Sequence, residues 1–271
     1  MQTKLGQTGR IEISDIEPGC GLRFMTIYSP SLYGRGDVTL YAPPGLEQIK
    51  SVPVVLLLHG VYGSHWAWFL KGAAHHTAEQ LIAQKKIRPM LLVSPSDGLS
   101  QDGSAYIRHS GRDFERWIVE DIPQALTRCL PCVDLHSPLF LSGFSMGGFG
   151  ALRLGAKYPA RFHGISAHSS ITHIREMGLF VHEPFPSYEI AADEANILFW
   201  IGKNHKHLPS FRLDCGLDDP LLGGNRRFHE QLQCMQIPHC YQEFPGGHEW
   251  SYWRNHLVET LLFFEEIFAR E

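Results

Sequence analysis

Apolar positions along the chain follow two patterns. Short runs that are apolar almost throughout, such as residues 52–60, are typical of strands buried on both faces of a parallel sheet. Longer stretches, such as residues 113–130, carry apolar residues at the spacing of one helix face. The predicted strands are 22–30, 37–44, 52–60, 88–97, 137–143, 162–170, 209–216 and 239–247. The predicted helices lie within 64–86 and at 113–130, 146–159, 196–204, 225–235 and 257–271.

Two stretches depart from a simple alternation of strands and helices. Residues 196–204 are apolar enough for a strand, but the stronger strand 209–216 lies too close for a crossover, so the first stretch is predicted to be helical. Residues 171–192 are irregular, aromatic and proline-bearing, and are predicted to form a small cap-like insert. In the rest of the chain strands and helices alternate, which predicts a single α/β domain over residues 1–271. It has a mostly parallel central sheet of about eight strands with helices on both faces.

Composition narrows the classes of protein to consider. With 44% hydrophobic and 19% charged residues, the chain can bury a sizeable core. A formal net charge of -4 without a basic block argues against a nucleic-acid partner. The longest apolar run is too short to span a bilayer, and the start, MQTKLGQTGRIEISD, lacks the apolar segment of a signal peptide. We therefore expect a cytoplasmic protein without a membrane partner.

Cysteine and histidine residues are candidates for metal or redox chemistry. The six cysteines are expected to be free thiols in a reducing compartment. The C-x-x-C spacing of Cys129 and Cys132 has no second close pair, so it is interpreted as a packed connection. The histidines at 75–76 and 205–207 lack the i, i+4 spacing of paired ligands and are interpreted as surface residues. We expect neither a metal nor another cofactor.

A glycine-rich motif overlaps the end of the predicted strand 137–143. Gly143-Phe144-Ser145-Met146-Gly147 fits G-x-S-x-G and leads into a predicted helix, which is the setting of a nucleophile elbow. The glycines leave room for a tight turn, and the helix N-terminus directs free N–H groups at the same place. The alternative is a glycine-rich helix start with a chance serine. The motif in this setting favours Ser145 as a catalytic nucleophile.

A nucleophilic serine needs a base, and the base needs a carboxylate that orients it. His248 follows the last predicted strand, and Asp218 and Asp219 follow the strand before it, so both kinds of partner lie in strand-end loops. For His248 the alternative is a lone surface histidine. Two backbone N–H groups are expected to form an oxyanion hole, one from Met146 and one from Val61 in the loop after strand 52–60.

Several segments together resemble the esterase D group of α/β-hydrolases, over residues from about 20 to 265. They are LLLHGVYGSHWAW, SGRDFERWIVEDIPQAL, LSGFSMGGFGALRLGAKYPARFHGISAHS, LDCGLDDPLLGGNRRFHEQL and FPGGHEWSYW. That group includes tributyrin-type carboxylesterases, feruloyl and acetyl-xylan esterases of carbohydrate esterase family one, S-formylglutathione hydrolases and bacterial mycolyltransferases. The resemblance implies an α/β-hydrolase fold. It also implies that the acid stands three residues after Gly216, at Asp219, with Asp218 as the alternative. S-Formylglutathione hydrolases resemble SGLTC where this chain reads HGVYG, which favours a general carboxylesterase.

These observations predict a serine carboxylesterase that hydrolyses short-chain acyl esters through an acyl-enzyme, with a small-molecule ester as its partner. Tyr62 and Trp66 in the oxyanion loop are expected to bound a small apolar acyl pocket, together with Phe180, Phe185 and Tyr188 in the insert. Alternatives with the same machinery are an S-formylglutathione thioesterase, a feruloyl or acetyl esterase, and an acyltransferase. A binding protein that keeps the fold is an alternative of another class, and a homodimer is left open.

Overall fold

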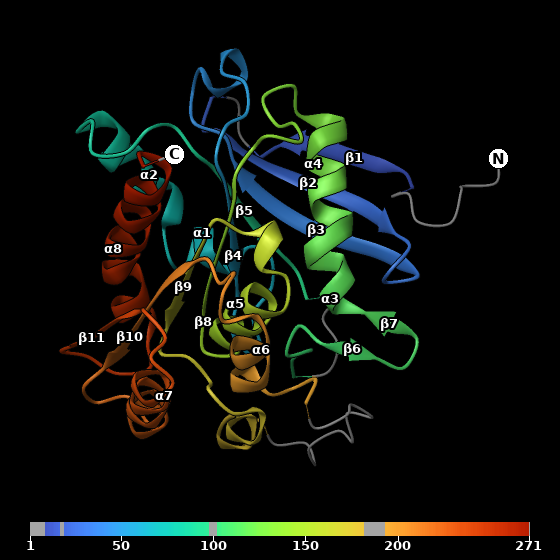
Figure 1. Cartoon of the computed structure of the whole chain (residues 1–271). Coiled ribbons are helices and arrows are strands. Elements are labelled where there is room, and N and C mark those ends of the chain that lie inside the picture. The colour runs from blue at the N-terminus through green and yellow to red at the C-terminus, as the bar shows by residue number, and fades with distance from the viewer. Residues whose placement is uncertain (1–8, 17–18, 98–101, 182–192, 271) are drawn as a thin grey trace.

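The computed structural model describes residues 9–16, 19–97, 102–181 and 193–270 (Figure 1). Its strands are β1 (Ile11–Asp15), β2 (Leu22–Ser29), β3 (Gly34–Tyr41), β4 (Val54–Leu58), β5 (Leu91–Pro95), β6 (Arg108–His109), β7 (Arg112–Asp113), β8 (Leu139–Phe144), β9 (Gly164–His168), β10 (Ser210–Gly216) and β11 (Cys240–Phe244). Its α-helices are α1 (Ala67–Leu70), α2 (Ala74–Ala83), α3 (Phe114–Arg116), α4 (Ile122–Cys129), α5 (Met146–Lys157), α6 (Ile197–Asn204), α7 (Leu222–Cys234) and α8 (Trp250–Phe268). None of the helices in these described ranges is long and apolar enough to cross a membrane.

Nine of the described strands form one sheet, in the order β1-β2-β3-β5-β4-β8-β9-β10-β11. Neighbours from β5 to β11 run parallel, whereas β1, β2 and β3 pair antiparallel, and β3 pairs antiparallel with β5. The predicted mostly parallel sheet is confirmed, and all eight predicted strands are present. β1 is the additional strand. Its residues, IEISD, are few, mostly polar and largely exposed, so the apolar pattern did not reveal it.

Helices cover both faces of the sheet, as predicted, and they enclose two hydrophobic cores. α1, α2 and α8 pack on one face, and α4, α5, α6 and α7 on the other (Figure 1). Because successive side chains of a strand point to opposite faces, β4 contributes to both cores. Val54, Leu56 and Leu58 belong to one core, and Val55 and Leu57 to the other. The uninterrupted apolar run of β4 follows from this double burial.

The predicted helix 113–130 forms, with a π-helical turn at Trp117–Asp121 between α3 and α4. Pro123 has no N–H to donate to the preceding turn, and its ring crowds the carbonyl four residues earlier. The Ile122 N–H bonds to the Trp117 carbonyl five residues back, which is the π spacing. The turn keeps Trp117 fully buried, with its indole N–H donating to the Ser96 carbonyl oxygen at 2.8 Å.

Other elements differ in extent from the prediction. α8 begins at Trp250 rather than at residue 257, because its aromatic first turn packs onto the sheet, with Tyr252 and Trp253 buried. α7 begins at Leu222 rather than at residue 225. Of the predicted insert 171–192, the described part contains a 3₁₀ helix, Ile174–Leu179. The remainder, including Phe185 and Tyr188, lies outside the described residues.

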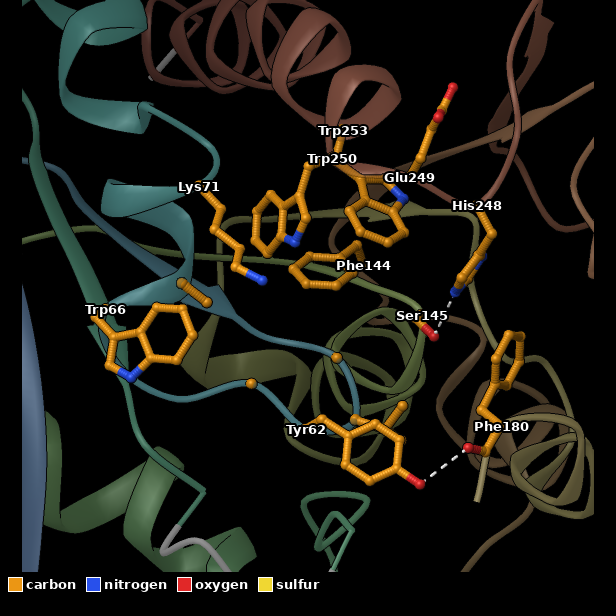
Figure 2. Close-up of a pocket in the computed structure, with 14 residues that line it drawn as sticks. Tyr62, Trp66, Lys71, Phe144, Ser145, Phe180, His248, Glu249, Trp250 and Trp253 are labelled. Carbon is orange, nitrogen blue, oxygen red and sulfur yellow. Dashed lines mark hydrogen bonds between the residues drawn. The ribbon is translucent and has the colours of Figure 1, made fainter. Parts of the chain in front are cut away.

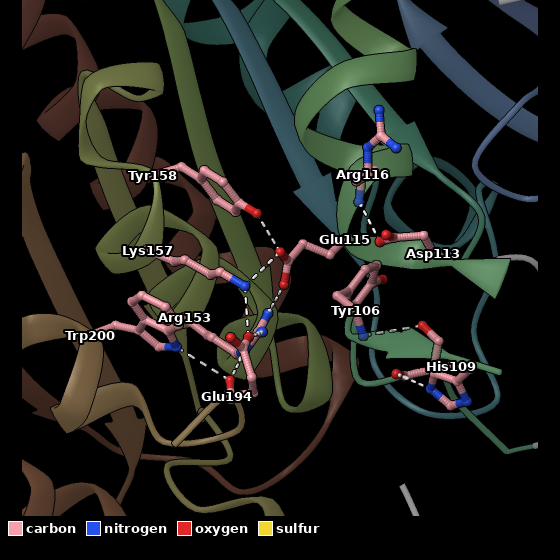
Figure 3. A network of polar contacts seen from close by, with 11 residues as sticks. Tyr106, His109, Asp113, Glu115, Arg116, Arg153, Lys157, Tyr158, Glu194 and Trp200 are labelled. Carbon is pink, nitrogen blue, oxygen red and sulfur yellow. Dashed lines mark hydrogen bonds and ion pairs between the residues drawn. The ribbon is translucent and has the colours of Figure 1, made fainter. Parts of the chain in front are cut away.

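A buried ion-pair network joins α3, α5 and the chain before α6 (Figure 3). Glu115 lies 2.6 Å from Arg153 Nη1 and 2.8 Å from Lys157 Nζ. Both cations also reach the Glu194 carboxylate, at 3.0 and 2.6 Å, and the Tyr158 hydroxyl donates to Glu115. Burial alone would favour the neutral acid, but Arg153 and its neighbours outweigh it and hold the pKa of Glu115 below its ordinary value of 4.5.

We predict that Glu115→Gln lowers the free energy of unfolding by about 3 kcal/mol at neutral pH, since it removes one partner of a buried charge pair. The lowered pKa means that folding favours the ionised acid. Its contribution is therefore complete above 4.5 and is lost as the pH falls through the folded-state value. Urea unfolding at several pH values should show the difference in unfolding free energy between wild type and Glu115→Gln becoming smaller as the pH falls below 4.5. Glu120→Gln, in an exposed pair with Arg116, should cost at most ~1 kcal/mol. A gap that does not change with pH would contradict the assignment.

Candidate active site

The sheet reverses its direction of winding between two adjacent parallel strands, β4 and β8. The chain leaving β4 crosses to β5 on one side, and the chain leaving β8 crosses to β9 on the other. Such a switch point opens a crevice at the carboxyl ends of the strands, where open α/β sheets bind ligands. Ser145 follows β8 and Val61 follows β4, so the fold brings both predicted residues to this crevice.

Ser145 occupies the tight turn between β8 and α5, with φ 54° and ψ −120°, a conformation that costs a non-glycine residue free energy. Its N–H donates to the His168 carbonyl at 3.0 Å, and its carbonyl accepts from the Ile171 N–H at 3.1 Å. Glycines make the turn sterically feasible. A Cβ on Gly143 would collide with the Gly147 backbone, and one on Gly147 would collide with the Leu58 carbonyl. The two glycines of the motif therefore reflect close backbone packing within the turn and against β4.

Three predicted side chains meet in one hydrogen-bonded row. The Ser145 hydroxyl lies 3.0 Å from His248 Nε2, and His248 Nδ1 lies 2.9 Å from Asp219 Oδ2. With the carboxylate accepting from Nδ1–H, Nε2 is left unprotonated and accepts from the serine hydroxyl. The Asp219 side chain is fully buried, whereas that of His248 keeps 15% of its surface exposed. This tautomer is the one that a general base toward Ser145 requires.

The turn after β10 distinguishes the two candidate aspartates. Asp219 is buried, and its second carboxylate oxygen accepts from the Leu221 N–H at 2.8 Å. Asp218 is exposed, and its own N–H donates to the Gly246 carbonyl at 2.9 Å. The structure thus places Asp219 against His248 and leaves Asp218 in solvent.

Aromatic rings hold the His248 imidazole from two sides. The Phe180 ring stacks on it, with centroids 4.7 Å apart and an interplanar angle of 23°. The Trp253 ring meets it edge to face at 5.0 Å. Both arrangements are favoured geometries of ring pairs. They restrict rotation of the imidazole, so the contact with Ser145 is preorganised.

The loop after β4 is fixed by buried hydrogen bonds. His59 Nδ1–H donates to the Gly60 carbonyl at 2.7 Å, and Nε2 accepts from the Asp97 N–H at 3.1 Å. The Tyr106 hydroxyl donates to the His59 carbonyl at 3.0 Å. This loop carries Val61 to the cavity wall beside Ser145. The buried role of His59 was not predicted, because HG after a strand also occurs in simple turns.

A second His–Asp pair lies beneath the site. His168 Nδ1 is 2.8 Å from Asp214, its Nε2 is 2.8 Å from the Thr260 hydroxyl, and the Tyr252 hydroxyl donates to Asp214 at 3.0 Å. Burial favours the neutral acid, but His168 and Arg212 outweigh it and lower the pKa of Asp214. The His168 and Asp214 side chains have no exposed surface, so no substrate reaches this pair. It links β9 and β10 to α8 and supports the backbone that holds Ser145.

A cavity of about 410 Å³ opens in front of Ser145 (Figure 2). Tyr62, Trp66 and Phe180, the three predicted substrate-binding residues within the described ranges, all line it. The Tyr62 hydroxyl donates to the Phe180 carbonyl at 3.2 Å, which joins the loop after β4 to the segment that contains Phe180. Sequence reasoning missed further lining residues, among them Lys71, Phe144, Glu249, Trp250 and Trp253. Only the aromatic run after His248 and the position of Phe144 inside the elbow motif could have indicated any of them.

The nine-stranded sheet and the residues at its switch point define an α/β-hydrolase. Residues 29–264 match the Esterase family, and the chain belongs to this family. An acetyl esterase of Caldicellulosiruptor saccharolyticus is 27% identical over 230 residues, which cover 78% of this chain and 82% of that protein.

Two solved structures extend the likeness across nearly the whole chain. A ferulic acid esterase superposes with a TM-score of 0.75 at 23% identity, covering 96% of this chain and 99% of the other. An S-formylglutathione hydrolase from Agrobacterium tumefaciens has a TM-score of 0.77 at 18% identity, covering 94% and 98%. The predicted fold and the predicted resemblance to this group of esterases are confirmed, and the chain is a hydrolase of the esterase family.

Proposed function

We propose that the protein is a serine carboxylesterase that hydrolyses short-chain acyl esters through an acyl-enzyme. The observation that carries this proposal is the continuous row from Asp219 through His248 to Ser145, which ends at the wall of an apolar cavity. A binding protein has no use for a strained serine aligned with a base and an orienting carboxylate. The match to the Esterase family supports the same reaction class.

In the acylation half, the Ser145 oxygen attacks the ester carbonyl carbon while His248 Nε2 accepts the hydroxyl proton. The carbonyl oxygen becomes an oxyanion. Met146 is the first residue of α5, so its N–H has no acceptor within the helix and is available to this oxyanion. The Val61 N–H is the proposed second donor, and each such donor is typically worth about 3 kcal/mol in the transition state. His248 then gives its proton to the departing alcohol oxygen as the C–O bond breaks.

Deacylation repeats these steps with water. His248 Nε2 removes a proton from a water molecule, whose oxygen attacks the acyl carbon bound to Ser145. The tetrahedral intermediate uses the same two N–H donors, and its collapse returns the proton to the serine oxygen. The carboxylic acid leaves, and the buried Asp219 carboxylate stabilises the imidazolium in both halves.

Short acyl chains are the proposed substrates because rigid rings bound the cavity. The volume of about 410 Å³ limits the size of the acyl group that can lie in the cavity. Each methylene that fits contributes roughly 0.8 kcal/mol of burial, whereas one that does not fit forces repacking of Tyr62, Trp66 or Phe180. A feruloyl esterase is the second candidate. The aromatic wall of Trp250 and Trp253 and the similarity to a ferulic acid esterase favour it.

We predict a maximum of kcat/KM at acetyl to butyryl esters and a steep fall by octanoyl, measured with p-nitrophenyl esters of rising chain length. Methyl ferulate and S-formylglutathione belong in the same panel, since each tests one alternative. A flat profile, or a maximum at long chains, would show that the rings do not limit the acyl pocket. No hydrolysis of any ester in the panel would refute the proposed function.

A further inference from the structure

Lys71 brings a positive charge into an otherwise largely apolar cavity. The residue directly follows α1, and its side chain reaches the cavity wall between Trp66 and Phe144 (Figure 2). Among the described residues that line this cavity, it is the one that carries a permanent positive charge. The catalytic row described above does not use it.

The backbone at Lys71 is held by hydrogen bonds, so the fold fixes the point from which its exposed side chain extends. Its N–H donates to the Ala67 carbonyl at 3.0 Å, and that of Gly72 donates to the same oxygen at 3.2 Å. Trp68, within α1, is fully buried and anchors the turn through its indole N–H, which donates to the Leu58 carbonyl at 2.9 Å. The loop that carries Lys71 is therefore tied to β4.

The ammonium has no carboxylate partner within the described part of the chain. Its Nζ lies 5.8 Å from the centroid of the Trp66 ring, a contact that holds the cation without neutralising it. Glu249 is the one acidic residue of the described lining, and its carboxylate points away from Ser145 and Lys71 (Figure 2). The Lys71 side chain is exposed, so water screens part of its charge, but the apolar walls of the cavity beside it still strengthen its attraction for an anion bound there.

We propose that Lys71 is a specificity-determining residue that selects esters bearing a carboxylate remote from the scissile bond. The ester carbonyl would lie at Ser145 and a short apolar spacer along Phe144, with the carboxylate at the ammonium. This inference rests on the proposed esterase function and narrows it to a chemical class, anionic esters. The carboxylate can belong to the acyl group or to the alcohol, and the two are separated by the choice of substrate.

The test compares esters matched in size that differ in charge. p-Nitrophenyl pentanoate and mono-p-nitrophenyl glutarate differ on the acyl side, and p-tolyl acetate and p-acetoxybenzoate differ on the alcohol side; in each pair a methyl group is replaced by a carboxylate. The measured quantity is the ratio of kcat/KM for the anionic ester to that for its neutral match. Spontaneous hydrolysis, including attack by the substrate's own carboxylate, is subtracted with the Ser145→Ala protein.

For at least one pair, we expect Lys71→Met to lower this ratio about tenfold, the factor that ~1.4 kcal/mol gives. Lys71→Arg, which keeps the charge, should retain most of the preference. Lys203→Met is the matched control, because Lys203 also lies over a tryptophan ring, that of Trp200 at 4.8 Å, but outside the cavity. It should leave the ratio unchanged.

Salt gives a second readout that a purely structural role would not move. Raising the ionic strength from ~0.01 M to ~0.15 M shortens the Debye length from about 30 Å to about 8 Å. The ratio should fall in wild type and much less in Lys71→Met. If wild type hydrolyses neutral esters but its ratios equal those of Lys71→Met, the Lys71 proposal is wrong and the esterase proposal stands. If wild type hydrolyses no ester of either charge, the proposed function itself fails.

Discussion

Replacement of Ser145 by alanine is expected to abolish ester hydrolysis, with a loss in kcat on the order of 10⁶. The whole reaction passes through the serine oxygen, so removing it costs about as much as removing the complete row of Ser145, His248 and Asp219. Turnover of p-nitrophenyl acetate by purified wild-type and variant proteins measures the loss. The variant should stay folded, because the hydroxyl contributes only the bond to His248 Nε2 at 3.0 Å.

Covalent labelling separates the chemistry of Ser145 from mere binding. A fluorophosphonate probe should add to wild type at one site, seen as a mass shift that peptide mapping locates at Ser145. The Ser145→Ala protein should not be labelled, and its circular dichroism should match that of wild type. Activity within tenfold of wild type, or labelling at another serine, would exclude this residue as the nucleophile.

The parts of the site that depend on local backbone geometry could be predicted from the sequence. Gly143 is required because it packs against the backbone of Gly147, and Gly147 because it packs against the backbone of β4, so the constraint falls on residues within one short motif. The buried strands could be predicted for a similar reason. A strand such as β4, covered on both faces, must be apolar at every position.

The side of the cavity formed by Lys71, Phe144, Trp250 and Trp253 could not be predicted, because it forms only when separate segments pack together. Phe144 ends β8 and stacks on Trp253 of α8, with ring centroids 4.0 Å apart. Lys71 comes from the turn after α1, and no motif marks it. Their meeting depends on how α1 and α8 pack on one face of the sheet. The apolar periodicity of each helix does not contain that information.

The choice between Asp218 and Asp219 could be predicted only in part from the sequence. From the residues alone, either of two adjacent carboxylates could orient His248, and only the resemblance to related esterases favoured Asp219. The backbone hydrogen bonds of the turn after β10 determine which of the two carboxylates faces His248. The Asp219 N–H donates to the Gly216 carbonyl at 3.2 Å, and the Asp218 N–H donates to the Gly246 carbonyl. These bonds direct consecutive side chains to opposite sides, one toward the imidazole and one toward solvent.

Asp219→Asn is expected to lower kcat by about 10⁴. An amide NH₂ facing His248 Nδ1 would favour the tautomer with the proton on Nε2, and that nitrogen could then no longer accept the Ser145 proton. The amide oxygen can still accept from the Leu221 N–H, so the turn should keep its shape. The measurement is kcat for p-nitrophenyl acetate at neutral pH, beside thermal unfolding to show that the protein is intact.

Asp218→Asn is the matched control for this substitution. It makes the same chemical change one residue earlier, at an exposed side chain whose backbone bond to the Gly246 carbonyl is retained. Surface substitutions of this kind usually change free energies by less than ~0.5 kcal/mol, so kcat should change by no more than about twofold. A large loss from Asp218→Asn together with a small loss from Asp219→Asn would mean that the other carboxylate orients His248 during turnover. Equal and large losses would point instead to a loop whose folding depends on both acids, which thermal unfolding of the two variants would reveal.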